Sequence, residues 1–186
     1  MSKKYKFQEE TGLHFITATT VGWVDLLTRQ HNRDILIDCL KWCQEHKGLH
    51  ICAYVIMTNH IHMVAYTDRE PLSKVMQSFK KFTAARLLEV VNERPESRKE
   101  WLLRLLKWFG NQKGQAHQVW EWENHPISLW TAEVVCQKIR YLHQNPVRAG
   151  YVAEPEHWLY SSASTYAGIG VPLLQVEILD LWGVGS

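Results

Sequence analysis

The chain has 186 residues, of which 46% are hydrophobic and 22% are charged, and its formal net charge is +2. This length and balance predict a single domain over residues 1–186, which is large enough to bury a stable hydrophobic core without disulfides or structural metal ions. The sequence has no apolar run near the roughly 18 residues of a membrane span, and its polar start differs from a secretory leader. Four cysteines without paired spacing argue against a disulfide framework, so we expect a cytoplasmic protein without membrane contact.

The first half of the chain gives three strand signals and one helix signal. Aromatic and β-branched residues dominate the strand segments, whereas apolar residues recur at three-and-four spacing in the helix, which Gly48 ends. A Thr-Asn pair forms the tight turn of a hairpin between the second and third strands. The expected elements are strands over residues 12–21, 50–57 and 60–66, and a helix over residues 32–46.

The second half of the chain contains two longer helices and a charged connection. Residues 70–91 carry an apolar stripe typical of a helix, and residues 92–114 are charged, which indicates an excursion or a helical insert. The stretch QVWEWE, residues 118–123, alternates as a half-buried strand does. A last helix over residues 131–145 begins at a threonine N-cap and is stopped by a proline, and the chain after residue 146 is expected to be rich in loops.

The order of these elements predicts the fold class. A β-α-β-β-α-β order with a trailing helix is that of a ferredoxin-like α+β sandwich, in which helices cover one face of an antiparallel sheet. The other face of the sheet then needs a cover or a ligand.

Two histidines interrupt the apolar strand in the stretch TNHIHMVAY. Because side chains alternate across a strand, His60 and His62 share one face, about 7 Å apart. From that spacing two imidazole nitrogens can converge on one divalent ion and leave positions for a third ligand, water or substrate. A single histidine here would more often be a core residue, but two on one face favour a metal site.

The last helix offers candidates for the rest of a site. Tyr141 and Asn145 share one stripe with Val134 and Lys138, opposite an apolar stripe that should face the core. Tyrosine on a helix is usually a packing residue, and asparagine before proline is usually a cap, so these positions alone decide nothing.

Positive charge gathers in the middle of the chain. Residues 74–113 hold ten Lys or Arg against four Glu. This stretch suits a polyanion, although a solvated helix face would give the same count.

Three stretches together resemble a known family. VIMTNHIHMVA resembles the histidine-hydrophobe-histidine (HUH) motif of single-tyrosine transposases, and LSKVMQSFKKFTA is similar to the helix that follows it in that family. IRYLHQNPVRAGYV and PEHWLYSSASTYAG resemble the C-terminal signature of the REP-associated tyrosine transposases, which are relatives of insertion-sequence transposases. The likeness extends from YKF near the start to YAG near residue 168, and the charged connection at 101–114 is longer than usual.

The resemblance implies a fold, a reaction and a partner. It implies a ferredoxin-like fold with His60, His62 and Asn145 as ligands of Mg²⁺ or Mn²⁺ and Tyr141 as nucleophile. The implied activity is cleavage and joining of single-stranded DNA beside hairpins of repetitive palindromic elements, through a 5′-phosphotyrosine, by a monomer or a homodimer. The implied DNA contacts are phosphate contacts at Lys74, Lys80, Lys81, Arg86 and Arg148, and base stacking at Trp158 and Tyr160.

Several alternatives stay open. Trp158 and Tyr160 could instead belong to a packed tail that covers the sheet. The protein could be a domesticated hairpin-binding protein without catalysis, or a metal-dependent hydrolase in which Tyr141 only orients water. It could also be a protein-interaction module with structural histidines, which would bind no metal.

Overall fold

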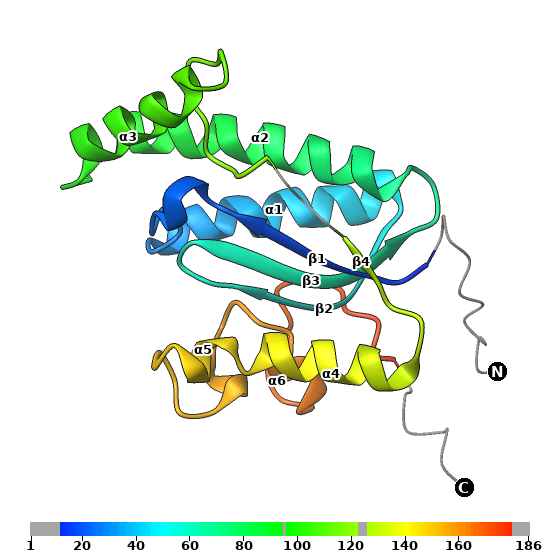
Figure 1. Cartoon of the computed structure of the whole chain (residues 1–186). Coiled ribbons are helices and arrows are strands. Elements are labelled where there is room, and N and C mark those ends of the chain that lie inside the picture. Colours follow the sequence, from blue (N-terminus) through cyan, green and yellow to red (C-terminus); the bar gives the residue numbers. More distant parts are fainter. Residues whose placement is uncertain (1–11, 95, 123–125, 180–186) are drawn as a thin grey trace, which may run out of the picture.

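A four-stranded antiparallel sheet lies between helices on both of its faces (Figure 1). The computed structural model describes residues 12–94, 96–122 and 126–179. Neighbouring strands are antiparallel and follow the order β2-β3-β1-β4. With two helices connecting the strands, this is the ferredoxin-like α+β arrangement predicted from the sequence. The elements are β1 (His14–Thr19), α1 (Gln30–Lys47), β2 (Leu49–Ile56), β3 (His60–Thr67), α2 (Leu72–Glu93) and β4 (Ile127–Ser128).

The first face of the sheet packs against α1 and α2. Ile16 of β1 and Ile61 and Met63 of β3 point to this side and are almost completely buried, together with Leu36 of α1 and Phe79 of α2. The alternation of the strands explains why every second residue of β3 joins this core. It also sends the histidines that lie between these positions to the other face.

The second face is covered by the C-terminal part of the chain. Helix α4 (Ala132–His143) buries Val135, Ile139 and Leu142 against the sheet, as its apolar stripe predicts. The Thr131 side chain accepts a hydrogen bond from the Val134 backbone amide, so Thr131 is the expected N-cap. Three short helices follow, and Figure 1 shows them on the same side of the sheet: α5 (Asn145–Arg148), η2 (Pro155–His157) and α6 (Ala163–Tyr166).

The C-terminal segment also covers the edge of the sheet at β2. The backbone amide of Ile56 donates to the Tyr160 carbonyl at 2.8 Å, and the Glu177 amide donates to the Ile51 carbonyl at 2.9 Å. These bonds satisfy groups that an open edge strand would expose. No helix in the described part of the chain is long and apolar enough to cross a membrane.

The charged connection after α2 contains a helix, α3 (Lys99–Asn111), which extends beside α2 (Figure 1). A further short helix, η1 (Val21–Trp23), follows β1. The long connection is therefore a helical insert, one of the two forms that the sequence predicted.

The strand predicted over residues 118–123 is wrong for the residues that are described. Trp120 forms only an isolated bridge with Thr20, and the fourth strand is the two-residue β4. The Trp120 side chain packs against α2, where its indole N–H donates to the Thr83 hydroxyl at 3.0 Å. The segment therefore pairs with the end of β1 through one isolated bridge and does not form a regular strand of the sheet. Glu123 lies outside the described residues.

Candidate functional site

The two histidines of β3 lie side by side on the face of the sheet that α4 covers. Their ring centroids are 4.6 Å apart, closer than strand spacing alone requires. His62 is buried, with 7% of its surface exposed, and His60 is partly buried. The register of β1 and β3 places Thr17 opposite His62 and Thr19 opposite His60.

Each imidazole is oriented through its Nδ1 atom. His60 Nδ1 lies 2.7 Å from Asn59 Oδ1, and His62 Nδ1 lies 2.8 Å from the Thr17 hydroxyl oxygen. An amide oxygen only accepts, so the proton of neutral His60 sits on Nδ1 and its Nε2 carries a lone pair. The Thr17 hydroxyl can accept from His62 in the same way. This is the arrangement in which a neighbouring group fixes the tautomer of a metal-binding histidine.

Burial keeps both imidazoles neutral. Desolvation, with a smaller effect from His60 and Lys138, lowers the pKa of His62 to about 3. The pKa of His60 is also lowered by desolvation, which outweighs the opposing effect of a hydrogen bond with the Asn145 side chain. Neutral nitrogens offer lone pairs at ordinary pH, so this pair is suited to bind a cation.

Helix α4 brings Tyr141 to the histidines. The Tyr141 ring centroid lies 5.5 Å from that of His62, and the two rings meet edge to face at 62°. Phe15 of β1 stacks on His62 at 5.1 Å and fills the space beneath both rings. Tyr141 remains 39% exposed, so its ring closes one side of the histidine pair while a part of it faces solvent.

Asn145 completes the group, one helical turn beyond Tyr141. Its side chain hydrogen-bonds the His60 side chain, and its Nδ2 lies 3.4 Å from the Tyr141 carbonyl oxygen. The structure thus brings together the four residues that the sequence singled out from two distant motifs.

Two cations flank the tyrosine. The Arg148 guanidinium carbon lies 5.2 Å from the Tyr141 ring centroid, and Lys138 Nζ lies 5.9 Å from it. Lys138 also lies 4.8 Å from the Phe15 ring. Positive charge at this distance attracts an anion such as a phosphate. Arg148 therefore lies beside Tyr141 in space as well as in sequence, and its contact with DNA stays a prediction.

The donor set fits a divalent ion with open positions. Two neutral imidazoles and one amide supply three ligands, which leaves room for water or a phosphate oxygen. In the described part of the chain, no group of three or more His, Cys, Asp or Glu side chains could hold a metal. A metal at the histidine pair would therefore need Asn145 or the substrate as a further ligand.

The predicted phosphate contacts divide into two groups. Lys74, Lys80 and Lys81 line one groove beside α2, away from the histidines. Arg86 lies outside that groove and forms an ion pair with Glu89 on the exposed face of the helix.

The structure contradicts base stacking by Tyr160, which is 3% exposed and donates from its hydroxyl to Asp34 Oδ1 at 2.6 Å. Trp158 is partly buried, stacks on Tyr151 at 5.3 Å and donates from its indole nitrogen to the Ile56 carbonyl. The packing alternative is correct for Tyr160, while base stacking by Trp158 stays a prediction. Both side chains help to attach the C-terminal segment to β2 and α1.

Sequence reasoning missed the residues that orient the histidines and cover them. Thr17 and Phe15 contact His62, while Asn59 and Trp23 contact His60, with the Trp23 ring 5.9 Å away. The strand periodicity shows that Phe15 and Thr17 share a face. Only the register of β1 against β3 shows that this face is the one carrying the histidines.

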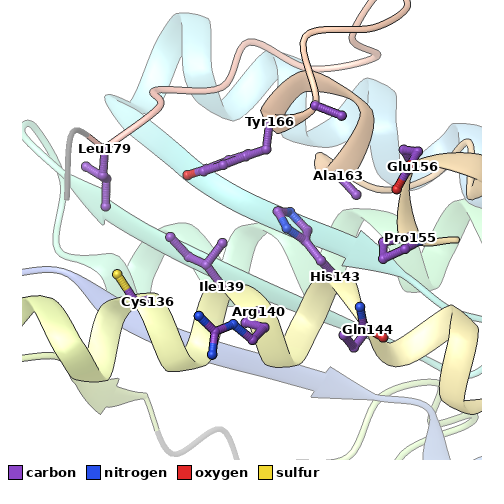
Figure 2. Close-up of a pocket in the computed structure, with 11 residues that line it drawn as sticks. Cys136, Ile139, Arg140, His143, Gln144, Pro155, Glu156, Ala163, Tyr166 and Leu179 are labelled. Atoms are coloured by element: carbon purple, nitrogen blue, oxygen red, sulfur yellow. The ribbon is translucent and has the colours of Figure 1, made fainter. Parts of the chain in front are cut away.

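A small cavity lies on the other side of α4, between this helix and α6 (Figure 2). Its volume is about 360 Å³, and Ile139, Arg140 and Tyr166 contribute to its lining. His143 also lines it, accepts or donates one hydrogen bond at 2.8 Å with the Ser162 hydroxyl, and has a pKa that burial lowers to about 4. This side of α4 attaches the helix to the C-terminal segment while the opposite side presents Tyr141.

Comparison with known families places the chain in one of them. Residues 12–105, just over half of the chain, match the family described as IS200-like transposase. The chain therefore belongs to the IS200-like transposase family, and its function is related to DNA transposition. The comparison with curated proteins gives no match.

Two solved structures resemble the fold. A REP-associated tyrosine transposase bound to a REP hairpin superposes with a TM-score of 0.61, at 16% identity, over 97% of this chain and 94% of that chain. A candidate transposase from Deinococcus radiodurans R1 gives a TM-score of 0.43, at 16% identity, over 77% of this chain and 97% of that chain. At such low identity the first likeness establishes the fold, including its C-terminal half beyond the family match.

Proposed function

We propose that this protein cleaves and rejoins single-stranded DNA beside a hairpin, through a covalent 5′-phosphotyrosine at Tyr141. The observation that carries the proposal is the position of Tyr141 against His62, with Asn145 of the same helical stretch bonded to His60. A packing tyrosine on α4 would not need neutral, oriented histidines beside it. Membership in the IS200-like family supports the reaction class.

In the proposed reaction the Tyr141 oxygen attacks the scissile phosphorus. The phosphorus keeps its bond to the 5′ oxygen of the downstream strand, forms a new bond to the Tyr141 oxygen and loses its bond to the 3′ oxygen, which leaves as a hydroxyl after taking a proton. The phenol gives up its own proton as it attacks. One phosphodiester bond is exchanged for another, so an incoming 3′-hydroxyl can reverse the step without ATP.

The residues around Tyr141 have separate tasks in this proposal. His60, His62 and Asn145 would hold Mg²⁺ or Mn²⁺, which when bound draws negative charge from a phosphate oxygen. Thr17 and Asn59 keep the two imidazoles in the orientation that exposes Nε2. Arg148 attracts the phosphate to the tyrosine and stabilises the phenolate as the proton leaves.

The proposed partner is DNA with a hairpin and an adjoining single strand. The similar solved structure was determined with a REP hairpin, which makes a repetitive palindromic element the first substrate to test. Lys74, Lys80 and Lys81 would contact the phosphates of this DNA, and their effect would weaken as salt rises. The protein could act as a monomer or as a homodimer.

The test is covalent capture of labelled hairpin DNA with a single-stranded flank, in Mn²⁺ or in chelator. We expect an adduct on denaturing gels that needs the metal and disappears in Tyr141→Phe but persists in Tyr151→Phe, a matched tyrosine that is also exposed. Hairpin binding without any adduct would support the binding protein without catalysis. Cleavage that persists in Tyr141→Phe would support the hydrolase that uses water.

A further inference from the structure

A groove on the far side of the sheet from Tyr141 takes no part in the bond exchange just described, although the three lysines proposed above as phosphate contacts line it. It lies between α2 and the segment at residues 115–122 that returns from α3, and its volume is about 610 Å³. This is within the range of sites for small ligands. We propose that the groove binds unpaired nucleotides of the DNA, with lysines on the phosphates and Trp122 against a base. The proposal rests on the proposed function in taking DNA as the ligand.

One wall of the groove is a polar stripe of α2. The core side of α2 is defined by Val75 and Phe79, which are fully buried. The groove side presents residues at i, i+1, i+4, i+7, i+8 and i+11, which include three lysines and one glutamine. Core packing does not explain the polar side chains of this stripe, because Ser73, Lys74, Gln77 and Lys81 are exposed. The α2 residues of the wall are Ser73, Lys74, Gln77, Lys80, Lys81 and Ala84.

The lysines of this wall are available to a ligand. The side chains of Lys74 and Lys81 have no ion-pair or hydrogen-bond partner among residues 12–94, 96–122 and 126–179. Lys80 is partly buried and donates to the Glu121 carbonyl at 2.6 Å, and its burial lowers its pKa to about 8. A lysine held in the groove without a carboxylate salt bridge gains most from a phosphate, which would satisfy its remaining N–H groups.

The second wall is held rigidly by the helical insert. The Gln118 backbone amide donates to the Leu106 carbonyl of α3 at 2.9 Å, and the Trp120 side chain is held against α2 by its hydrogen bond to the Thr83 hydroxyl. The chain passes so close to α3 that a Cβ at Gly110 would lie 2.7 Å from the His117 Cα. The long connection that departs from the family pattern thus positions residues 115–122, which form the second wall of the groove.

Trp122 stands at the mouth of the groove with 61% of its surface exposed. An exposed indole next to basic side chains is the combination that proteins use for unpaired nucleic acid, since a base stacks on the ring while cations follow the backbone. The Glu121 side chain, the one acidic group of this lining, accepts a hydrogen bond from the Gly22 amide at 3.1 Å. That bond holds the carboxylate toward η1.

The groove and the histidine site share the end of β1. The Glu121 amide donates to the Thr19 carbonyl at 2.8 Å, and Thr19 lies opposite His60 in the sheet. Trp23, next to Gly22, is 66% exposed and contacts the His60 ring. A strand that leaves the groove at Trp122 therefore reaches the histidines by passing around this edge of the sheet.

The test compares three labelled DNA probes by fluorescence anisotropy in chelator, which prevents cleavage: a blunt hairpin, the same hairpin with an unpaired tail, and a thymidine homo-oligomer. We expect Trp122→Ala to weaken binding of the tailed hairpin and the homo-oligomer by roughly 5- to 150-fold, the range that stacking on one base predicts. Trp101→Ala, an exposed tryptophan of α3 outside the groove, is the matched control and should change neither affinity.

The lysines give an independent measurement. In the double variant Lys74→Ala, Lys81→Ala, the slope of log affinity against log salt for the tailed probe should fall by about 1.4, which corresponds to two lost phosphate contacts to a single strand. Photocrosslinking of 5-iododeoxyuridine in the tail should map to Trp122, a result that does not depend on how well the variants fold.

The outcomes separate this proposal from the reaction at Tyr141. Equal affinity for blunt and tailed hairpins, or equal effects of Trp122→Ala and Trp101→Ala, would overturn the groove proposal even if adducts form. Tail binding that needs Trp122 in a protein that never forms an adduct would support the groove and contradict the cleavage. A homo-oligomer that does not bind, with no crosslink at Trp122, would contradict the groove directly.

Discussion

Burial of His143 should make the attachment of α4 sensitive to acid. The imidazole is neutral in the folded protein because burial lowers its pKa to about 4, whereas a histidine in the unfolded chain has a pKa near 6.5. Below pH 6.5 the unfolded state binds a proton that the folded state does not, so stability falls as pH falls toward 4 and is fully retained above 6.5. The linkage relation gives a loss of about 2 kcal/mol between pH 7 and pH 5 from this residue.

Denaturant unfolding at pH 7 and pH 5, in chelator, measures this loss. The pKa of His62 is also lowered in the folded protein, so its protonation on unfolding adds to the effect. The free energy of unfolding of wild-type protein should therefore fall by more than the contribution of His143 alone. His143→Gln removes the titrating group while keeping a polar partner for Ser162, and any cost of the substitution itself cancels between the two pH values. We expect the free energy of unfolding of the variant to fall by about 2 kcal/mol less than that of wild type. Equal losses would show that His143 does not titrate on unfolding and would refute the reasoning.

Three further predictions concern the two sites. Thr17→Val should weaken Mn²⁺ binding by about 10- to 100-fold, measured by calorimetry, while Thr17→Ser keeps it, because the hydroxyl orients His62. Gly110→Ala should lower the free energy of unfolding by about 1–3 kcal/mol despite the better helix propensity of alanine, since its Cβ meets backbone of the second groove wall; a stabilised variant would contradict this contact. Binding of the tailed hairpin should weaken as pH rises from 7 to 9, because Lys80 loses its charge near pH 8, and Lys80→Arg should remove this dependence in the same anisotropy assay.

Local patterns were sufficient for most of the fold. The periodicity of residues 32–46 and the apolar stripe of α4 predicted helices that begin and end within a few residues of those observed. The alternation around His60 and His62 predicted correctly that both face the same side. These features depend on sequence neighbours, which is why they can be obtained without knowing the tertiary structure.

Features that depend on distant contacts could not be obtained in this way. QVWEWE has the alternation of a strand, but the burial of Trp120 under α2 decides its path. Tyr160 is an aromatic residue of the kind that stacks on bases, yet it is buried in the core and its hydroxyl donates to Asp34. Only the register of β1 against β3 shows that Thr17 is a partner of His62. The groove depends on the path by which the chain returns from α3 to α2, which local patterns do not predict.

The nearness of Tyr141 to the histidine pair is the central element of this account, and peptide mapping of the covalent product tests it most directly. Wild-type protein incubated with flanked hairpin DNA and Mn²⁺ would be digested with nuclease and protease, and the modified peptide would be sequenced by mass spectrometry. We predict a nucleotide 5′-phosphate on Tyr141, in the peptide that also contains His143. A nucleotide on Tyr151 or another residue, or free 5′-phosphate ends with no modified peptide, would contradict the account.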